Sequence, residues 1–366
     1  MSRRAEPGAS PVEAFFADAA LEHASTAAAR GVAKHRLRFA DRLIALDFAG
    51  SQLPEALMGA LTARLASPPG AGGGRLDASI SLWEECAVPG GALTVPWRDE
   101  DVGPRGLVRD EAGDRVRAVH EAGSLAVTLF DETSGRLLHR VPSHARLPWW
   151  ERAAPLRPAL FWALGGPGRH LVHAGAVGDR RGGVLLAGAG GSGKTTVALA
   201  ALNAGMSYVG DDYVLLHADP RPVAWNLFGT AKLDAGHLGR FPTLASLVGA
   251  PTLAAGEKAV LDVHRSLPAA LCAQLPIRAL VLPRIRGGRA RLRRASAGEA
   301  LLALAPSTAF QMPFDDGRVL ASLAGLVRAV PSFSLDVGDQ PGELADALDN
   351  VLELAAVAPR EVEALA

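Results

Sequence analysis

The segment GVLLAGAGGSGKTTVALAALNAG, residues 183–205, constrains the fold of this chain more strongly than any other. A short apolar run comes first, a glycine-rich loop follows, and a run rich in alanine and leucine ends at Gly205. This order predicts a strand, a tight loop and a helix, the repeating unit of an α/β fold. The loop and the start of the helix are formed by Gly188, Ala189, Gly190, Gly191, Ser192, Gly193, Lys194, Thr195 and Thr196.

Residues 188–195 match the pattern GxxxxGK[ST] in full, and each residue type has a physical role. Glycines let backbone N–H groups curl around a phosphate without obstruction by Cβ atoms. Lys194 can reach the β- and γ-phosphates, and the Thr195 hydroxyl can ligate Mg²⁺. The N-terminus of the following helix also favours an anion. We therefore predict a nucleoside triphosphate site with ATP and Mg²⁺ as cofactors; the alternative is a glycine-rich linker that matches by chance.

Two adjacent carboxylates end the next apolar strand. Asp211 follows Lys194 by 17 positions, and Asp212 comes directly after it. Strand ends beside a phosphate loop face the ligand, so one carboxylate could accept a proton from an attacking hydroxyl while the other holds Mg²⁺, directly or through water. Neighbouring side chains of an extended segment point in opposite directions, which favours different roles. The alternative is a surface turn.

Four further residues are weaker candidates. His173 lies on the apolar run that leads to the loop, where it is either a core histidine or a contact to the γ-phosphate region. Lys232 and Lys258 either add positive charge beside the transferring phosphoryl group or are exposed lysines. Arg284, at the end of an apolar strand, is a candidate for substrate or phosphate binding.

The basic run RIRGGRARLRR, residues 284–294, is predicted to be a solvated hairpin with its turn at Gly-Gly. An alternative is a docking patch for an acidic peptide. The run contains no aromatic residue, which argues against nucleic-acid binding.

Composition excludes several classes of function. The formal net charge is zero, so general attraction to nucleic acid or to anionic membranes is not expected. The two cysteines, Cys86 and Cys272, are far apart and suggest neither a zinc site nor a disulfide framework. No signal peptide and no apolar run of about 18 residues is found, so we expect a soluble cytoplasmic protein without a membrane span.

Two domains are predicted. Residues 1–150 indicate a smaller mixed α/β domain with hairpins around Ala40-Asp41 and over 131–135, and with a glycine- and proline-rich break at 67–75. Residues 147–165 are predicted to form a connecting helix. Residues 166–366 alternate strand and helix patterns around the phosphate loop and form the nucleotide-binding α/β domain.

Residues 173–216 resemble the catalytic domain of HPr kinase/phosphorylase and its relatives. That family has a histidine before a hairpin, then the phosphate loop, a helix ending in glycine and a strand ending in Asp-Asp, in the same order and spacing as here. The resemblance implies the P-loop fold shared with ATP-dependent phosphoenolpyruvate carboxykinases, preceded here by the smaller domain. It implies Asp211 as general base, Asp212 as metal or orienting carboxylate and His173 on the phosphate side.

This chain differs in two motifs from the family members that are both kinase and phosphorylase. Those enzymes have an acidic residue directly after GK[ST], where this chain has Thr196, and a Glu-x-Arg-Gly signature, for which Glu257 and Lys258 are the nearest match. The chain is more similar to the divergent relatives encoded beside peptide-modification genes, including lasso-peptide precursor kinases.

We therefore predict an ATP- and Mg²⁺-dependent kinase acting on a hydroxyl, with a serine in a peptide or small protein as the expected acceptor. A small-molecule hydroxyl kinase and a nucleotide-binding regulator with little turnover are the alternatives. ABC-type ATPases and GTPases are disfavoured, because neither an LSGGQ-like nor an NKxD motif is present. The smaller domain is expected to recognise the acceptor or mediate self-association, and related kinases suggest a homo-oligomer.

Overall fold

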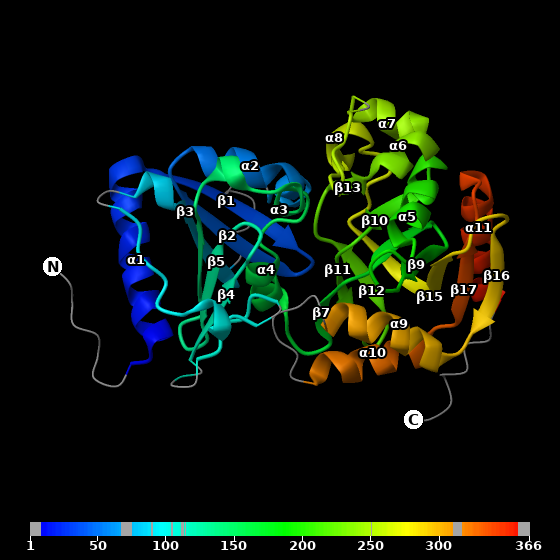
Figure 1. The fold of residues 1–366 in the computed structure, drawn as a ribbon. Helices are drawn as coiled ribbons and strands as arrows, with labels where there is room; N and C mark the ends of the chain where they lie inside the picture. The colour runs from blue at the N-terminus through cyan, green and yellow to red at the C-terminus, as the bar shows by residue number, and fades with distance from the viewer. Residues whose placement is uncertain are drawn as a thin grey trace. The chain divides into compact units, whose positions relative to one another are not determined.

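The computed structural model describes residues 9–66, 75–88, 91–103, 105–110, 113, 115–249, 251–309 and 317–357. The chain divides into two compact units, Met1–Gly165 and Gly166–Ala366 (Figure 1). Of the break predicted at 67–75, residues 67–74 lie outside the described part of the chain. Both units are mixed α/β structures, with parallel and antiparallel pairs of strands in each large sheet.

The first unit is a six-stranded sheet in the order β1-β2-β3-β6-β5-β4. Its strands are β1 (Val32–Phe39), β2 (Arg42–Ala49), β3 (Ala78–Glu84), β4 (Val116–His120), β5 (Val127–Asp131) and β6 (Arg136–Val141). Its α-helices are α1 (Pro11–Arg30), α2 (Gln52–Leu61), α3 (Trp149–Ala153) and α4 (Arg157–Leu164). Four short 3₁₀ helices complete it: η1 (Thr62–Arg64), η2 (Glu85–Ala87), η3 (Asp99–Asp101) and η4 (His144–Arg146).

The sequence predicts two hairpins of this unit correctly, β1–β2 and β5–β6. Ala40 takes a positive φ of 53° at the turn between β1 and β2. In the turn between β5 and β6, the Asp131 carboxylate accepts hydrogen bonds from the Thr133 N–H at 3.1 Å and from the Ser134 hydroxyl at 2.6 Å. In both turns a local side-chain or backbone preference is sufficient to reverse the chain.

The predicted single helix over 147–165 is wrong. The structure has two helices, α3 and α4, and Leu156 between them adopts the left-handed conformation with φ of 59°. Pro158 stands in the first turn of α4, where a proline starts a helix readily but could not continue the one before it.

The second unit contains a nine-stranded sheet and a separate two-stranded sheet. Its strands are β7 (Arg169–Val172), β8 (Gly175–Asp179), β9 (Gly182–Leu186), β10 (Ser207–Gly210), β11 (Val214–His217), β12 (Val223–Asn226), β13 (Thr230–Leu233), β14 (Ala259–Asp262), β15 (Gln274–Ile285), β16 (Arg291–Ala295) and β17 (Ser332–Val337). Its helices are α5 (Lys194–Asn203), α6 (Ala235–Arg240), α7 (Pro242–Leu247), α8 (Val263–Ser266), α9 (Ala297–Ala309), α10 (Arg318–Ala329) and α11 (Pro341–Val357).

The long strand β15 organises the large sheet. It pairs in parallel with β9 and β17, and its first residues pair antiparallel with β12. The hairpin partner of β9 is β8, which also pairs with β10, so β9 and β10 run in the same direction with β8 between them. The carboxyl ends of β9, β10, β15 and β17 therefore lie at one end of the sheet, where the phosphate loop begins.

The predicted hairpin over residues 284–294 is wrong as well. β16 does not pair with β15; β17, which is distant in sequence, lies between them and pairs with both. The two glycines, Gly287 and Gly288, take positive φ values of 71° and 69° in a wider connection. The basic run thereby ends on the border of the sheet instead of folding back on itself.

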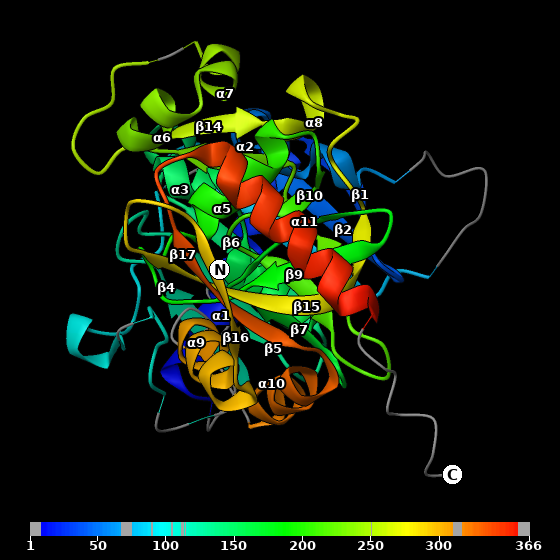
Figure 2. The ribbon, with the colours of Figure 1, turned by 90° about the vertical axis from the view of Figure 1, so that its right-hand side faces the viewer.

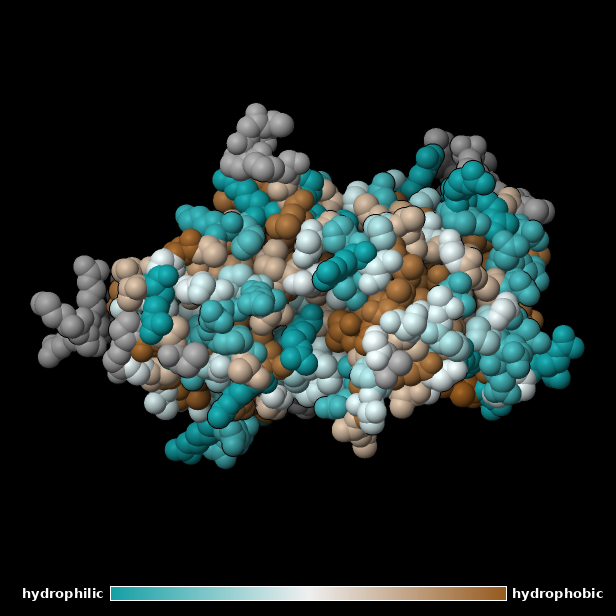
Figure 3. Space-filling model, turned by 90° about the horizontal axis from the view of Figure 1, so that it is seen from above, coloured by the Kyte–Doolittle hydropathy of each residue, from teal (hydrophilic) through white to brown (hydrophobic). Residues whose placement is uncertain are grey.

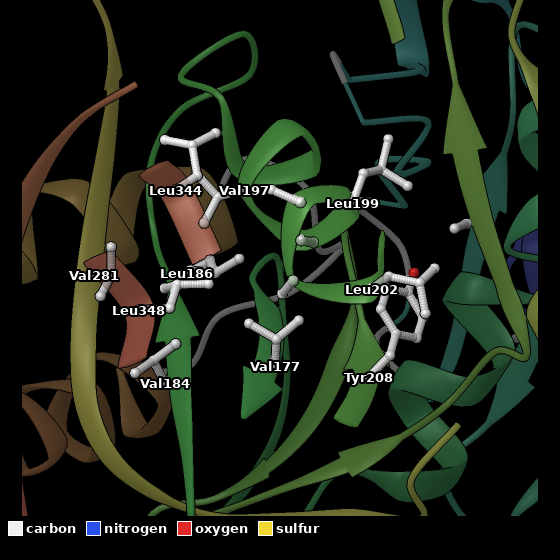
Figure 4. Packing of buried hydrophobic residues seen from close by; sticks show 14 of the residues in the cluster. Val177, Val184, Leu186, Val197, Leu199, Leu202, Tyr208, Val281, Leu344 and Leu348 are labelled. Atoms are coloured by element: carbon white, nitrogen blue, oxygen red, sulfur yellow. The ribbon is translucent and has the colours of Figure 1, made fainter. Parts of the chain in front are cut away.

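Two apolar clusters cover the faces of the large sheet. One contains α5 and α11 with β8, β9, β15 and β17, and the other contains α9 and α10. Figure 4 shows Val197 of α5 and Leu344 of α11 in the first cluster, close to Leu186 of β9. Because all three side chains are buried, this packing fixes α5, and with it the phosphate loop, on the sheet.

Candidate functional site

The glycine-rich loop that ends at Gly193, here called the phosphate loop, connects β9 to α5 as predicted. Lys194 is the first residue of α5. The Lys194 ammonium donates hydrogen bonds to the carbonyl oxygens of Gly188 at 2.6 Å and Ala189 at 3.2 Å. Burial lowers the pKa of Lys194, and Asp212 and Asp211 act in the opposite direction. The ammonium is thus held inside the loop by neutral carbonyl groups, which leaves its charge available to an anion.

Gly193, the last residue of the loop before α5, requires glycine for two reasons. It takes a φ of 106°, and a Cβ atom there would stand 3.0 Å from Val337 Cγ2 and 3.3 Å from Ile285 Cγ1. The first value places Gly193 in the left-handed region that favours glycine. Side chains of β15 and β17 therefore pack closely against Gly193, and a larger residue there would not fit without a shift.

Asp211 lies directly after β10 and is 4% exposed. Its Oδ1 atom is 3.0 Å from the Tyr208 hydroxyl, which also lies 2.9 Å from the Thr230 carbonyl oxygen. Its Oδ2 atom is buried and makes no well-formed hydrogen bond to another residue of the described part of the chain. Burial raises the pKa of Asp211, while the Lys232 ammonium and the nearby Thr195 hydroxyl lower it. Asp211 is therefore a desolvated carboxyl beside the phosphate loop.

Asp212 has a different environment from its neighbour. His173 Nε2 lies 2.9 Å from its Oδ1 atom, and the Lys232 ammonium forms an ion pair with its Oδ2 atom. Burial acts to raise the pKa of Asp212, but Lys232 and His173 outweigh burial and hold this pKa well below its usual range. Asp212 is therefore the ionised member of the carboxylate pair, and both of its oxygens have protein partners.

Lys232 reaches this site from the small sheet. It lies on β13, opposite Val260 of β14, and is 9% exposed. Burial acts to lower its pKa, yet Asp212 and Asp211 raise it above the usual value, so the ammonium stays charged. The structure thus brings Lys232 to Asp212, as a buried cation in an ion pair.

His173 is not within a strand, as the apolar run suggested, but between β7 and β8. Its ring lies 5.3 Å from the Tyr213 ring, and its backbone N–H donates to the Thr308 hydroxyl at 3.3 Å. Its Nδ1 atom is buried with no hydrogen-bond partner in the described part of the chain. His173 therefore contacts Asp212 directly, and its second nitrogen is turned into the protein.

The Thr196 side chain contacts α6. Its hydroxyl lies 2.9 Å from His237 Nε2, on α6, and Asp234 caps this helix by accepting from the His237 N–H at 2.9 Å. Burial lowers the pKa of His237, which keeps the ring neutral. The side chain of Thr196 thus connects α5 to the segment that follows β13, and its predicted contact to a nucleotide would have to come from its backbone.

The two remaining candidates lie at different places. Lys258 is half-buried just before β14 and acts electrostatically on both Lys194 and His237. Arg284 is exposed at the end of β15 and pairs with Glu299 at 3.5 Å. Lys258 therefore lies near Lys194. Arg284 also stands beside the loop, between two residues that approach Gly193, but its side chain is exposed and pairs with Glu299.

The sequence interpretation did not identify the partners of these residues. Tyr208 and Tyr213 are the two tyrosines of the chain, and both contact the site. Tyr208 stands three positions before Asp211 in an apolar strand, and this spacing is a usable signal for a buried hydroxyl beside a carboxylate. His237, three positions after the helix-capping Asp234, offers a similar local signal.

The residues present suit a triphosphate and a hard cation. The Lys194 ammonium lies within the loop, and the buried Asp211 Oδ2 atom makes no well-formed hydrogen bond to the residues that the structure describes. Mg²⁺ typically binds one or two carboxylates together with water and phosphate oxygens, so a cluster of many ligands is not required. In the described ranges no group of three or more histidine, cysteine, aspartate or glutamate side chains is arranged to hold a metal ion.

The structure is a mixed α/β protein in which a glycine-rich loop connects β9 to α5. No protein-family model and no curated protein matches the chain. Among solved structures, it is similar to the HPr(Ser) kinase/phosphatase from Coxiella burnetii, at 14% identity and a TM-score of 0.30, over 50% of this chain and 95% of that chain. A similarity of this extent does not define the family, so function has to be argued from the residues of the site.

None of the helices in the described ranges combines the length and the apolar character that crossing a membrane requires.

Proposed function

We propose that this chain is an ATP- and Mg²⁺-dependent kinase that transfers the γ-phosphoryl group to a hydroxyl, with a serine of a peptide or small protein as the acceptor. The observation that supports this most directly is the buried Asp211 carboxyl, which lies beside Thr195 of the phosphate loop and whose Oδ2 atom makes no well-formed hydrogen bond among the described residues. A hydrolase or motor needs to position water, whereas a kinase needs a base for a larger hydroxyl.

In this proposal Asp211 accepts the proton of the attacking hydroxyl. Its burial raises its pKa, and a carboxylate is a better base when its pKa is nearer to the working pH. Tyr208 holds the opposite oxygen of the same carboxyl at 3.0 Å, so the free Oδ2 atom is oriented. A base held in this way can act only on a group that approaches from the side of Thr195.

The cations of the site act on the phosphoryl group. Lys194 and the loop N–H groups bind the triphosphate, and the Lys232 ammonium, 9% exposed, contributes positive charge next to the two carboxylates. The transition state of phosphoryl transfer spreads negative charge over three oxygens, so fixed cations in a desolvated place stabilise it. ATP supplies the phosphoryl group, and Mg²⁺ neutralises its oxygens when bound.

Thr195 and Asp212 are the residues proposed to hold Mg²⁺. Both Asp212 oxygens have protein partners, His173 and Lys232, so a contact through water fits its surroundings better than direct ligation. A predominantly ionised Asp212 is suited to that role. His173 then acts by fixing the orientation of Asp212.

The acceptor and the role of the unit Met1–Gly165 remain predictions. We propose that this unit recognises the acceptor or mediates self-association, and that the protein acts in the cytoplasm, possible acceptors being peptides encoded by neighbouring genes.

The test is incubation of the protein with γ-labelled ATP, Mg²⁺ and those peptides. Asp211→Asn should reduce transfer by about 10²–10⁴-fold, the usual contribution of a positioned base, while ATP binding is largely retained. Asp346→Asn, a change of an exposed carboxylate on α11, is the matched control. A phosphoserine formed at the wild-type rate by Asp211→Asn would refute the proposed base.

A further inference from the structure

We propose that the border of the large sheet formed by residues 284–295 binds an extended acidic segment of the acceptor polypeptide, which adds to β16 as a further strand. This surface, the arginine border, contains six arginines and one exposed apolar residue. They are Arg284, Ile285, Arg286, Arg289, Arg291, Arg293 and Arg294. The inference rests on the proposed function only in taking the bound segment as part of the phosphate acceptor.

The first observation is an open edge. Among the described residues β16 pairs with β17 alone, in antiparallel register from Arg291–Asp336 to Ala295–Ser332. Figure 1 shows β16 at the outer border of the sheet, and Figure 2, which is viewed from that side, shows β16 on the side turned toward the viewer. The N–H and C=O groups on its outer side are therefore available to another extended chain.

The second observation is the charge of this edge. Arg289, Arg291 and Arg293 are exposed, and Arg293 is paired with Asp336 at 3.3 Å and Arg289 with Glu343 at 3.3 Å. Arg286 and Arg291 form no ion pair with another described residue.

Four carboxylates surround the six arginines: Glu299, Asp336, Asp339 and Glu343. Since the whole chain has no net charge, this excess of positive charge is local. Figure 3 shows a mainly hydrophilic surface at the right-hand end of the molecule, where β16 and α11 lie in Figure 1.

The arginines flank both faces of the edge. Arg294 lies opposite Phe333, with its guanidinium carbon 4.7 Å from the ring centroid, whereas Arg291 and Arg293 point to the other face because side chains alternate along a strand. An added strand alternates in the same way, so acidic side chains at every second position would meet arginines of one face. Backbone pairing supplies affinity here, and this alternation supplies specificity.

The third observation is the position of the border relative to the phosphate loop. Ile285 is 62% exposed, and a Cβ atom on Gly193 of the loop would stand 3.3 Å from its Cγ1 atom. Strands lie about 4.8 Å apart, so a strand added outside β16 would run about 14 Å from β15 and about 29 Å from β10, which Asp211 follows. About nine extended residues span the longer distance. A peptide bound on the border could therefore bring a hydroxyl about nine residues beyond the bound segment to Asp211, with Ile285 as an apolar contact on the way.

Charged side chains on an edge strand can instead serve only to prevent aggregation. Strand β1 of the first unit shows what such protection looks like, because Arg36 and Arg38 are exposed along the border of its own sheet. The border at β16 belongs to the same unit as the phosphate loop, and the exposed Ile285 lies between the border and the loop. The pair Arg36 and Arg38 therefore provides the matched control for the test.

The experiment measures binding of fluorescent peptides to the full-length protein by anisotropy, without nucleotide. The probe peptide alternates glutamate with valine around one serine. One control peptide has lysine in place of glutamate, and a second keeps the glutamates but has proline in place of valine, which removes backbone N–H donors. The protein variants are Arg286→Gln/Arg291→Gln on the border and Arg36→Gln/Arg38→Gln on β1.

We expect the glutamate–valine peptide to bind, and the border variant to weaken binding about fivefold to tenfold, since two exposed charge contacts are lost. The β1 variant should bind as the wild type does, and both control peptides should bind at least tenfold more weakly. Equal binding of the proline peptide would overturn strand addition, and equal binding of the lysine peptide would overturn charge recognition.

A loss of binding in the β1 variant alone would move the docking surface to the first unit and overturn the proposal. Since no phosphoryl transfer is measured, a failure of docking and a failure of the kinase activity are separate results. The Asp211→Asn protein, which should lose transfer, should still bind the glutamate–valine peptide with wild-type affinity.

Discussion

Replacing Lys232 by methionine tests the electrostatic arrangement of the site most directly. Methionine keeps the unbranched shape of the side chain and removes the ammonium, so the Asp212 carboxylate loses the cation that its Oδ2 atom contacts. Asp211 loses the same charge, which lowers its pKa in the wild type. Two adjacent carboxylates are then left with His173 as the remaining close partner of Asp212.

The size of the effect follows from burial. Lys232 is 9% exposed, and removing one member of a buried ion pair costs about 3–5 kcal/mol because the other charge remains desolvated. The Asp212 side chain is 22% exposed and keeps the His173 contact at 2.9 Å, so we expect a loss at the low end, about 3 kcal/mol. Nucleotide binding should weaken by at least about tenfold, which corresponds to about 1.4 kcal/mol, because uncompensated carboxylates repel a triphosphate.

Urea unfolding gives the free energy of unfolding, and titration with a fluorescent ATP analogue gives the affinity. Lys258→Met is the control, since Lys258 is half-buried near the loop. The double variant Lys232→Met/Asp212→Asn should recover part of the lost stability, as removing both charges leaves none uncompensated. The reasoning is refuted if Lys232→Met and Lys258→Met differ by less than about 0.5 kcal/mol, within the usual effect of a surface substitution.

Three further predictions concern other contacts. Lys194→Ala should weaken the nucleotide complex and abolish phosphoryl transfer, and retained transfer in a γ-labelled ATP assay would contradict the phosphate-loop assignment. Thr196→Val removes the hydroxyl that contacts His237 and should cost about 1–2 kcal/mol in urea unfolding, whereas an unchanged midpoint would show that this contact contributes nothing. Burial lowers the pKa of His139 from 6.5 to about 4, so its contribution to stability is complete above pH 6.5 and is lost between pH 6.5 and 4. This amounts to about 3 kcal/mol, and His139→Gln should flatten that part of the pH–stability curve; parallel curves for the two proteins would exclude it.

The elements that the sequence predicts well are those with local signals. The phosphate loop has glycines at positions of positive φ, such as Gly191 and Gly193, and a buried apolar strand and helix on either side. The hairpin turns at Ala40 and at Asp131 depend on residues within the turn. In each case the residues that decide the conformation lie within a few positions of one another.

The predictions that failed depend on contacts between distant residues. The basic run was expected to fold back on itself, but β17, about forty positions further along, pairs with β15 and excludes β16 from it. Burial of Phe333 and Leu335 against α5 and α11 makes β17 a central strand. No residue pattern within 284–294 indicates that a distant strand will pair with β15. Local propensity therefore favoured a hairpin between β15 and β16.

The residues of the site were likewise predictable only where the signal is local in the sequence. Asp211, Asp212 and Lys194 are marked by their motif and spacing, and the different partners of the two aspartates agree with the expectation that neighbouring side chains diverge. Lys232, by contrast, could be identified only as a candidate, because its contact with Asp212 requires the small sheet of β13 and β14 to bring it there.

The pairing of Asp212 with a buried lysine also explains how two adjacent carboxylates can differ in protonation. Two carboxylates with equal surroundings would share one proton, and neither would have a defined role. Here the Lys232 ammonium and His173 both contact Asp212. Asp211 has the hydroxyls of Tyr208 and Thr195 beside it, and burial raises its pKa more than the Lys232 charge lowers it. The cation therefore favours the charged form of Asp212, and burial favours the neutral form of Asp211. In the proposed kinase, Lys232 would thus do more than attract the phosphate, since by keeping Asp212 ionised it leaves Asp211 as the carboxyl whose pKa burial raises.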